Sequence, residues 1–253
     1  MLAATLGADT WSQVTAPEAR LAIGQLTDNA ATGNSDTEFQ FVRLAYSSAF
    51  NFGRGRGWMT DAPEAEEHLL DGIHRLTRVR AGTEGQHVAI MDADLFDHPW
   101  LYAVEVGSWV LDDAEAARLR DYLLRGGFLV VDDFHGTREW AGFVASMQRV
   151  FPDRAIVDIP MDDPVFHVVY DLVDRVQIPG IVSLSTGLTY ERDGYTPEWR
   201  GIYDDQDRLM VVINFNMDLG DGWEHPDTPE YSLKYTTRAY QYAINYIVYA
   251  MTH

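Results

Sequence analysis

The 253-residue sequence contains no cysteine. This absence excludes disulfide bonds, thiolate zinc sites and every reaction that uses a cysteine nucleophile. It does not assign a cellular compartment, because a chain without thiols is stable in both oxidising and reducing surroundings.

Basic residues are scarce. Lys and Arg together number 19 against 39 Asp and Glu, which gives a formal net charge of −20 at pH 7. A charge of this sign and size repels the phosphates of nucleic acids and of anionic membranes, so we expect neither as a partner. It fits a well-solvated protein, or one that handles cations or neutral ligands.

Long apolar runs are missing too. No stretch approaches the roughly 20 apolar residues that a membrane-spanning helix needs, so we expect no direct membrane span. Residues 1–5 lack the basic and apolar regions of a signal peptide, and export would require a signal upstream of this numbering. The rest of the composition, 46% hydrophobic and 23% charged, is typical of a globular protein.

Strand-like and helix-like segments alternate between residues 38 and 151. Strands are expected at 39–46, 88–91, 100–106 and 128–131, and helices open near Asp61, Asp112 and Thr137. Glu115 stands three residues after Asp112 as in a capping box, and Gly126 ends that helix. The alternation predicts a three-layer α/β fold with a mainly parallel sheet covered on both faces.

The second half of the chain has a less regular pattern. Short strands are expected at 155–159 and 166–170, and strands 199–203 and 208–215 flank a hairpin turn at 204–207. A loop at 216–229 precedes a last helix at about 230–251. We expect residues 1–36 to form a separate N-terminal arm or linker with a helical segment near 17–26, and residues 37–253 to form a single domain.

The buried strand at 128–131 runs into Asp132, Asp133 and His135. In open α/β sheets, ligands bind at the carboxyl ends of the strands. Carboxylates and imidazole suit Mg, Mn, Zn or Fe, and the same groups can act as general acid and base. The alternative is that the aspartates cap the helix that begins near Thr137, with His135 in a structural hydrogen bond.

A second polar motif follows the strand at 208–215. It contains Asp218, Asp221, Trp223, Glu224 and His225. Its spacing matches neither a calcium loop nor the H-E-x-x-H helix of zinc proteases, and a solvated acidic loop is the alternative. If both preceding strands are parallel, the two motifs share one edge of the sheet.

A glycine-rich loop carries Arg54 and Arg56, with Trp58 directly after it. The two arginines are typical of an anion-binding turn, or they pair with Asp132, Asp133 or Asp218 across the cleft. Trp58 either stacks on a sugar or closes the core. The serines do not fall in a G-x-S-x-G elbow, so a serine hydrolase is not expected.

Four segments resemble one bacterial family, the domain of unknown function 4159, over about residues 39–253. They are FVRLAY at 41–46, GGFLVVDDFHG at 126–136, GDGWEH at 220–225 and NYIVYA at 245–250. That family is similar to the class I glutamine amidotransferase-like proteins, and in pattern to the trehalose-utilisation (ThuA-like) proteins among them.

The resemblance implies a flavodoxin-like sandwich. Glutaminase activity is excluded because the nucleophilic cysteine is absent. Relatives often carry export signals, which implies a periplasmic or cell-envelope location, and otherwise the protein is cytoplasmic.

Three functions remain open from the sequence. The first is a binding module for a small polar ligand, such as a carbohydrate, or for a protein partner, in which six residues bind the ligand: Arg54, Arg56, Trp58, Asp218, Asp221 and Trp223. The second is a metal-assisted hydrolase or isomerase. Its divalent ion is held by Asp132, His135, Glu224 and His225, with Asp133 and His135 catalytic. The third is a structural subunit that forms a homo-oligomer through residues 1–36.

Overall fold

The computed structural model describes residues 37–48 and 57–253, so the N-terminal arm lies outside the described residues. Seven strands form one sheet in the order β2-β1-β3-β4-β7-β6-β5. Their bounds are β1 Val42–Ala45, β2 Gln86–Ala89, β3 Trp100–Val104, β4 Phe128–Asp132, β5 Val157–Asp158, β6 Glu198–Tyr203 and β7 Leu209–Phe215.

The first five strands in this order pair in parallel, while β6 is antiparallel to both β7 and β5. The parallel part, β2-β1-β3-β4-β7, has the strand order of flavodoxin-like sheets. The predicted three-layer α/β fold with a mainly parallel sheet is confirmed.

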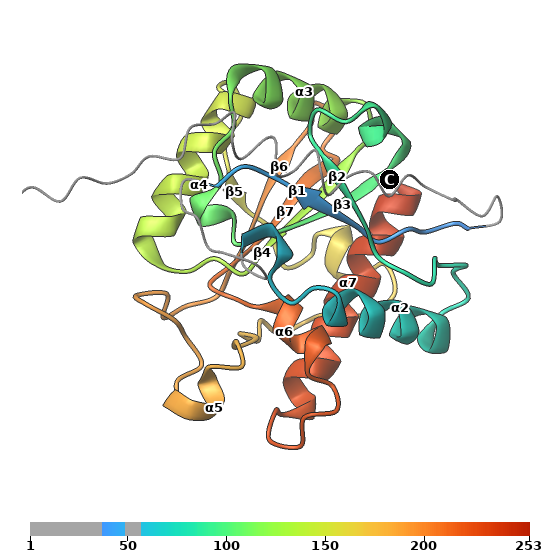
Figure 1. Ribbon diagram of the computed structural model, residues 1–253, viewed down its shortest axis with the longest axis vertical. Coiled ribbons are helices and arrows are strands. Elements are labelled where there is room, and N and C mark those ends of the chain that lie inside the picture. Colours follow the sequence, from blue (N-terminus) through green and yellow to red (C-terminus); the bar gives the residue numbers. More distant parts are fainter. Residues whose placement is uncertain (1–36, 49–56) are drawn as a thin grey trace, which may run out of the picture.

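Helices cover both faces of this sheet (Figure 1). The α-helices are α2 Glu64–Leu76, α3 Asp113–Leu124, α4 Gly136–Val150, α5 Ser183–Thr186, α6 Leu219–Glu224 and α7 Leu233–Thr252. Short 3-10 helices are η1 Gly57–Met59, η2 Ala93–Asp97, η3 Val106–Ser108 and η4 Pro164–Phe166. No helix in the described part of the chain is long and apolar enough to cross a membrane.

Two apolar cores lie on the two faces of the sheet. Alternate residues of β4 enter different cores, with Phe128 and Val130 on one side and Leu129 and Val131 on the other. The first core also contains buried apolar residues of α2, α6 and α7, and the second contains buried apolar residues of α3 and α4. A strand that is buried on both faces is largely apolar, as β4 and β7 are apart from Asp132 and Asn214, which form hydrogen bonds.

Local signals in the sequence place several of these elements. The predicted capping box forms at α3: the Asp112 side chain accepts from the Glu115 N–H, and the Glu115 side chain accepts from the Asp112 N–H, both at 2.8 Å. Gly126, at φ +112°, follows the end of the same helix as predicted. The hairpin of β6 and β7 also forms, with β7 between β4 and β6.

Two predictions in the second half are wrong. Residues 166–170 do not form a strand, because the backbone of Tyr170 bonds instead to the side-chain amide of Asn245 in α7, at 2.9 Å and 3.0 Å. Residues 216–229 are not all loop, because α6 forms within them. Its first N–H groups find an acceptor in Asp132 of β4, which outweighs the low helix propensity of Gly220 and Gly222.

Candidate functional site

The polar motifs meet at the carboxyl end of the parallel strands. Helix α2, which follows β1, packs on one face of the sheet, and α3, which follows β3, packs on the other. The connections therefore change sides between β1 and β3, and ligands bind beside such a point at the carboxyl edge of open α/β sheets. Strands β4 and β7 are parallel neighbours, so the prediction that both motifs share one edge is confirmed.

Asp132 anchors α6 to β4. It has no accessible surface, and its Oδ2 accepts hydrogen bonds from the Tyr102 hydroxyl at 2.9 Å and from the N–H groups of Leu219 and Gly220 at 2.8 Å and 3.0 Å. Burial raises the pKa of Asp132 to about 7 although these hydrogen bonds oppose the shift. Asp132 is thus a positioning residue that joins three elements of this edge.

Asp133 and His135 are joined to each other, with 3.1 Å between Asp133 Oδ1 and His135 Nε2. Burial lowers the pKa of His135 to about 3, so its imidazole is neutral at physiological pH. The aspartate pair does not cap α4, since the N–H of Thr137 donates to Asp193 at 2.9 Å. The helix-capping alternative for Asp132 and Asp133 is therefore wrong.

The second motif forms α6 and its two ends. Asp218 caps this helix by accepting from the Asp221 N–H at 2.7 Å, and Asp221 Oδ2 accepts from the Ile181 N–H at 2.5 Å. A Cβ on Gly180 would lie 2.8 Å from a carboxylate oxygen of Glu191, 2.9 Å from one of Asp218 and 3.2 Å from one of Asp221. Three carboxylates thus converge beside a residue that has no side chain.

Asp61 also lies at this edge, although the sequence indicated only a helix start there. A Cβ on Gly220 would overlap with Asp61 Oδ2, so the carboxylate lies directly against α6. This Oδ2 is buried and has no hydrogen-bond partner among the described residues. Asp61 at φ +63° and Asp133 at φ +47° adopt left-handed conformations, which cost about 1–3 kcal/mol each and cluster at functional sites.

Two groups of side chains have the spacing of metal ligands. Ligand atoms of Asp61, Asp133 and Asp218 all lie within 4.8 Å of one another, and so do those of Asp221, Glu224 and His225. The predicted ligand set is therefore divided: Glu224 and His225 join Asp221, while Asp132 and His135 belong to neither group.

The first group, Asp61, Asp133 and Asp218, has unfavourable electrostatics. Burial raises the pKa of all three carboxyls well above the usual range, and the neighbouring carboxylates raise it further. Asp221 contributes for each of the three, and Arg43 opposes the shift at Asp61. A bound cation would remove this mutual repulsion.

Arg43 is a buried residue of β1 that contacts the turn before Asp61. The residue is 1% exposed, and its side chain pairs with Glu66 at 2.5 Å (Nη2–Oε2) and 3.2 Å (Nε–Oε1). Its Nη1 donates to the carbonyl oxygens of Trp58 and Thr60 at 3.2 Å and 2.8 Å. Arg43 therefore fixes the turn that carries Asp61, a role that the sequence pattern did not indicate.

The remaining predicted residues lie in different places. Trp223 has no accessible surface and packs against Phe41 and Tyr102 in the first core, with no face open to a ligand. The ring of Trp58 packs against His87 of β2 and the second core. Arg54 and Arg56 lie outside the described residues.

These features define a three-layer α/β protein with a carboxylate-rich site at the carboxyl edge of its sheet. The model of a family described as a domain of unknown function, DUF4159, matches residues 40–251, and the chain belongs to this family. Comparison with curated proteins gives no significant match.

Proposed function

We propose that the carboxyl edge of the sheet binds a divalent cation through Asp61, Asp133 and Asp218 and uses it in the hydrolysis or isomerisation of a small polar substrate. The mutual spacing of these three ligand atoms, within 4.8 Å, is the observation that carries the proposal. Oxygen ligands alone favour the hard cations Mg²⁺, Mn²⁺ and Ca²⁺. The unpartnered Oδ2 of Asp61 supports the same conclusion, because a buried oxygen without a partner is costly.

We assign proton transfer to the second group. His225 Nε2 lies 3.3 Å from Asp221 Oδ1 and 3.4 Å from Glu224 Oε2, and the side chains of His225 and Glu224 keep 22% and 25% of their surface exposed. A general base must reach the proton that it abstracts from a substrate, and His225 and Glu224 are more accessible to a substrate than the more deeply buried Asp133 and His135 are. Asp132 and His135 position the site.

The test is cation binding to the full chain after treatment with a chelator. Titration calorimetry with Mn²⁺ should give one ion at the first group, and Asp61→Asn, Asp133→Asn and Asp218→Asn should each weaken it by at least about tenfold. Asp97→Asn is the matched control, because Asp97 is an exposed aspartate outside the site. Absence of binding at millimolar Mn²⁺, or equal binding by all variants, would refute the cation site.

The pairing of Arg54 and Arg56 with the carboxylates of the site is tested with a separate variant. If Arg54 and Arg56 neutralise the carboxylates, Arg54→Ala/Arg56→Ala should strengthen Mn²⁺ binding, because a competing positive charge is removed. Unchanged binding would exclude that pairing.

The chemical step is tested with chromogenic p-nitrophenyl esters and phosphates in the presence of Mn²⁺. Hydrolysis should require the cation and be lost in His225→Ala while Mn²⁺ still binds. Bound cation without turnover on these esters or on a panel of isomerase substrates would favour the second candidate, a binding module for a small polar ligand. A groove of ligand-binding size between α2 and α7 supports that candidate independently.

The likeness to other protein families, the location in the cell and the mode of assembly are proposals as well. The strand order of the parallel part supports a likeness to the class I glutamine amidotransferase-like and ThuA-like proteins. A periplasmic or cell-envelope location rests on that resemblance alone, and the cytoplasm is the alternative. Assembly through residues 1–36 is a third proposal, which size determination of the chain with and without these residues would test.

A further inference from the structure

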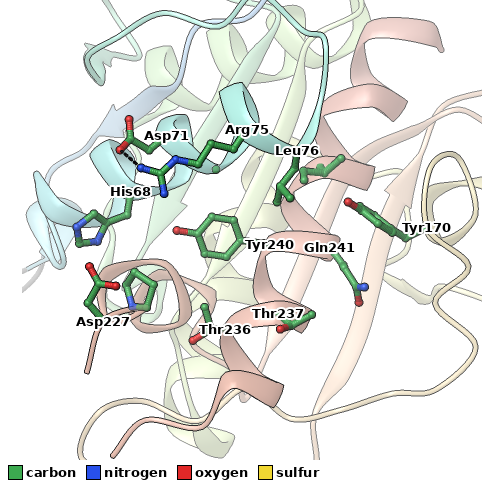
Figure 2. A pocket seen from close by; sticks show the side chains of 13 residues that line it. His68, Asp71, Arg75, Leu76, Tyr170, Asp227, Thr236, Thr237, Tyr240 and Gln241 are labelled. Atoms are coloured by element: carbon green, nitrogen blue, oxygen red, sulfur yellow. Dashed lines mark ion pairs between the residues drawn. The ribbon is translucent and has the colours of Figure 1, made fainter. Parts of the chain in front are cut away.

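A groove between α2 and α7 lies outside the carboxylate site (Figure 2). Its volume is about 530 Å³, within the range of about 300–1,000 Å³ that is typical of small-molecule sites. Tyr240 projects into the middle of it from α7, and its ring packs so closely on α2 that a Cβ on Gly72 would overlap with it.

The polar groups of the groove include both donors and acceptors. His68 Nδ1 lies 3.2 Å from the Trp223 carbonyl oxygen and 3.0 Å from the Glu224 carbonyl oxygen. Carbonyl oxygens only accept, so Nδ1 carries the hydrogen, and in the neutral ring Nε2 is left as an acceptor. Burial raises the pKa of Tyr240 to about 12, so its hydroxyl keeps its proton and can donate.

A buried hydroxyl at the same groove lacks a partner. Thr236 is 8% exposed, and its Oγ1 makes no hydrogen bond within the part of the chain that the structure describes. An unsatisfied buried hydroxyl is destabilising, and a rotation of the Thr236 side chain that brings it to a ligand hydroxyl in the groove would remove that cost. Thr236 therefore offers a hydroxyl that no described residue already binds.

The charges of the groove disfavour an anionic ligand. Asp71 and Asp227 line it, and Arg75, 3.5 Å from Asp71, compensates only one of these two negative charges. An uncharged ligand with many hydroxyl groups matches this mixture of donors and acceptors, and the faces of Tyr240 and Tyr170 suit its C–H groups (Figure 2).

We propose that the groove between α2 and α7 binds a neutral, hydroxyl-rich ring compound of the saccharide class. The Tyr240 ring and hydroxyl, the Thr236 hydroxyl and His68 Nε2 are its main contacts. This site is separate from the cation site, and its occupation does not require a metal.

The test is ligand-observed saturation-transfer NMR on the full chain in EDTA, so that failure of the cation site does not affect it. The probes are cellobiose, maltose and diacetylchitobiose, with choline and glucuronate as charged controls. We expect saturation transfer to at least one disaccharide and to neither charged control.

Matched variants locate the binding. Tyr240→Phe removes only a hydroxyl and should weaken the binding of the disaccharide by about fivefold, as expected for the loss of one neutral hydrogen bond. Thr236→Val should weaken the binding of the disaccharide by a similar factor. The controls Tyr195→Phe and Thr83→Val change exposed residues outside the groove, and these variants should bind the disaccharide as tightly as the parent chain does. Circular dichroism would establish that each variant is folded.

Two results would overturn the proposal. The first is no transfer to any of the three disaccharides, or transfer to choline or glucuronate in their place. The second is disaccharide binding that is unchanged in both Tyr240→Phe and Thr236→Val, which would place the sugar elsewhere on the protein.

Discussion

The buried ion pair of Arg43 and Glu66 allows a demanding test of the structure. In Glu66→Ala, the guanidinium loses its only described anionic hydrogen-bond partner while it stays buried between β1 and α2. Two hydrogen bonds to a charged group are worth about 1.5–3 kcal/mol each, or about 3–6 kcal/mol together. Breaking a buried pair in other proteins costs about 3–5 kcal/mol, which agrees with that sum.

We therefore expect Glu66→Ala to lower the free energy of unfolding by about 3–5 kcal/mol. Urea denaturation followed by tryptophan fluorescence would measure it, with Glu67→Ala as the control, because Glu67 is an exposed neighbour in the same helix. A loss below about 1 kcal/mol, the value typical of an exposed ion pair, would show that Arg43 is not buried as described.

The double variant Arg43→Met/Glu66→Leu separates stability from function. Replacement of both charges by apolar groups should restore most of the stability, since buried pairs are often no better than hydrophobic substitutes. The turn that carries Asp61 would still lose the two hydrogen bonds from Arg43 Nη1. We expect a stable protein with weakened Mn²⁺ affinity, and parental affinity would refute the positioning role of Arg43.

Three further predictions concern single residues. Asp112→Ala removes the capping box of α3 and should lower stability by about 1 kcal/mol in urea denaturation, and an unchanged midpoint would contradict the cap. Tyr246→Phe leaves the buried Oδ1 of Asn214 without its 2.8 Å partner and should lower stability by about 1–3 kcal/mol, while the exposed Tyr195→Phe should leave it unchanged. The third concerns Asp132, whose pKa burial raises to about 7, so the folded state keeps this proton to a higher pH than the unfolded state does. In EDTA, stability should therefore fall as the pH rises from about 4 to 7, and this fall should be smaller in Asp132→Asn; equal slopes would refute the assignment.

The main elements of the fold were predictable from local patterns. The apolar runs that became β4 and β7 had to be buried on both faces, and the chemistry of Asp112, Glu115 and Gly126 bounded α3. Such signals act within a few residues of each other, and therefore appear directly in the sequence. The same reasoning placed both polar motifs at the ends of parallel neighbouring strands.

Only the tertiary structure shows which residues make up the candidate site. Asp61 joins Asp133 and Asp218 because β1 and β4 are close in the sheet and Arg43 fixes the intervening turn. Helix α6 forms because Asp132 accepts its first N–H groups, and its formation places Trp223 in the core.

The sequence by itself thus determined the order and kind of most elements of the α/β sheet and the presence of polar motifs after two central strands. The tertiary structure decided which carboxylates share a site, that residues 166–170 bond to α7, and that a groove opens beside Tyr240. The physical reason is that these contacts join residues far apart in the chain, so their partners are set by the packing of elements and not by neighbours in the sequence.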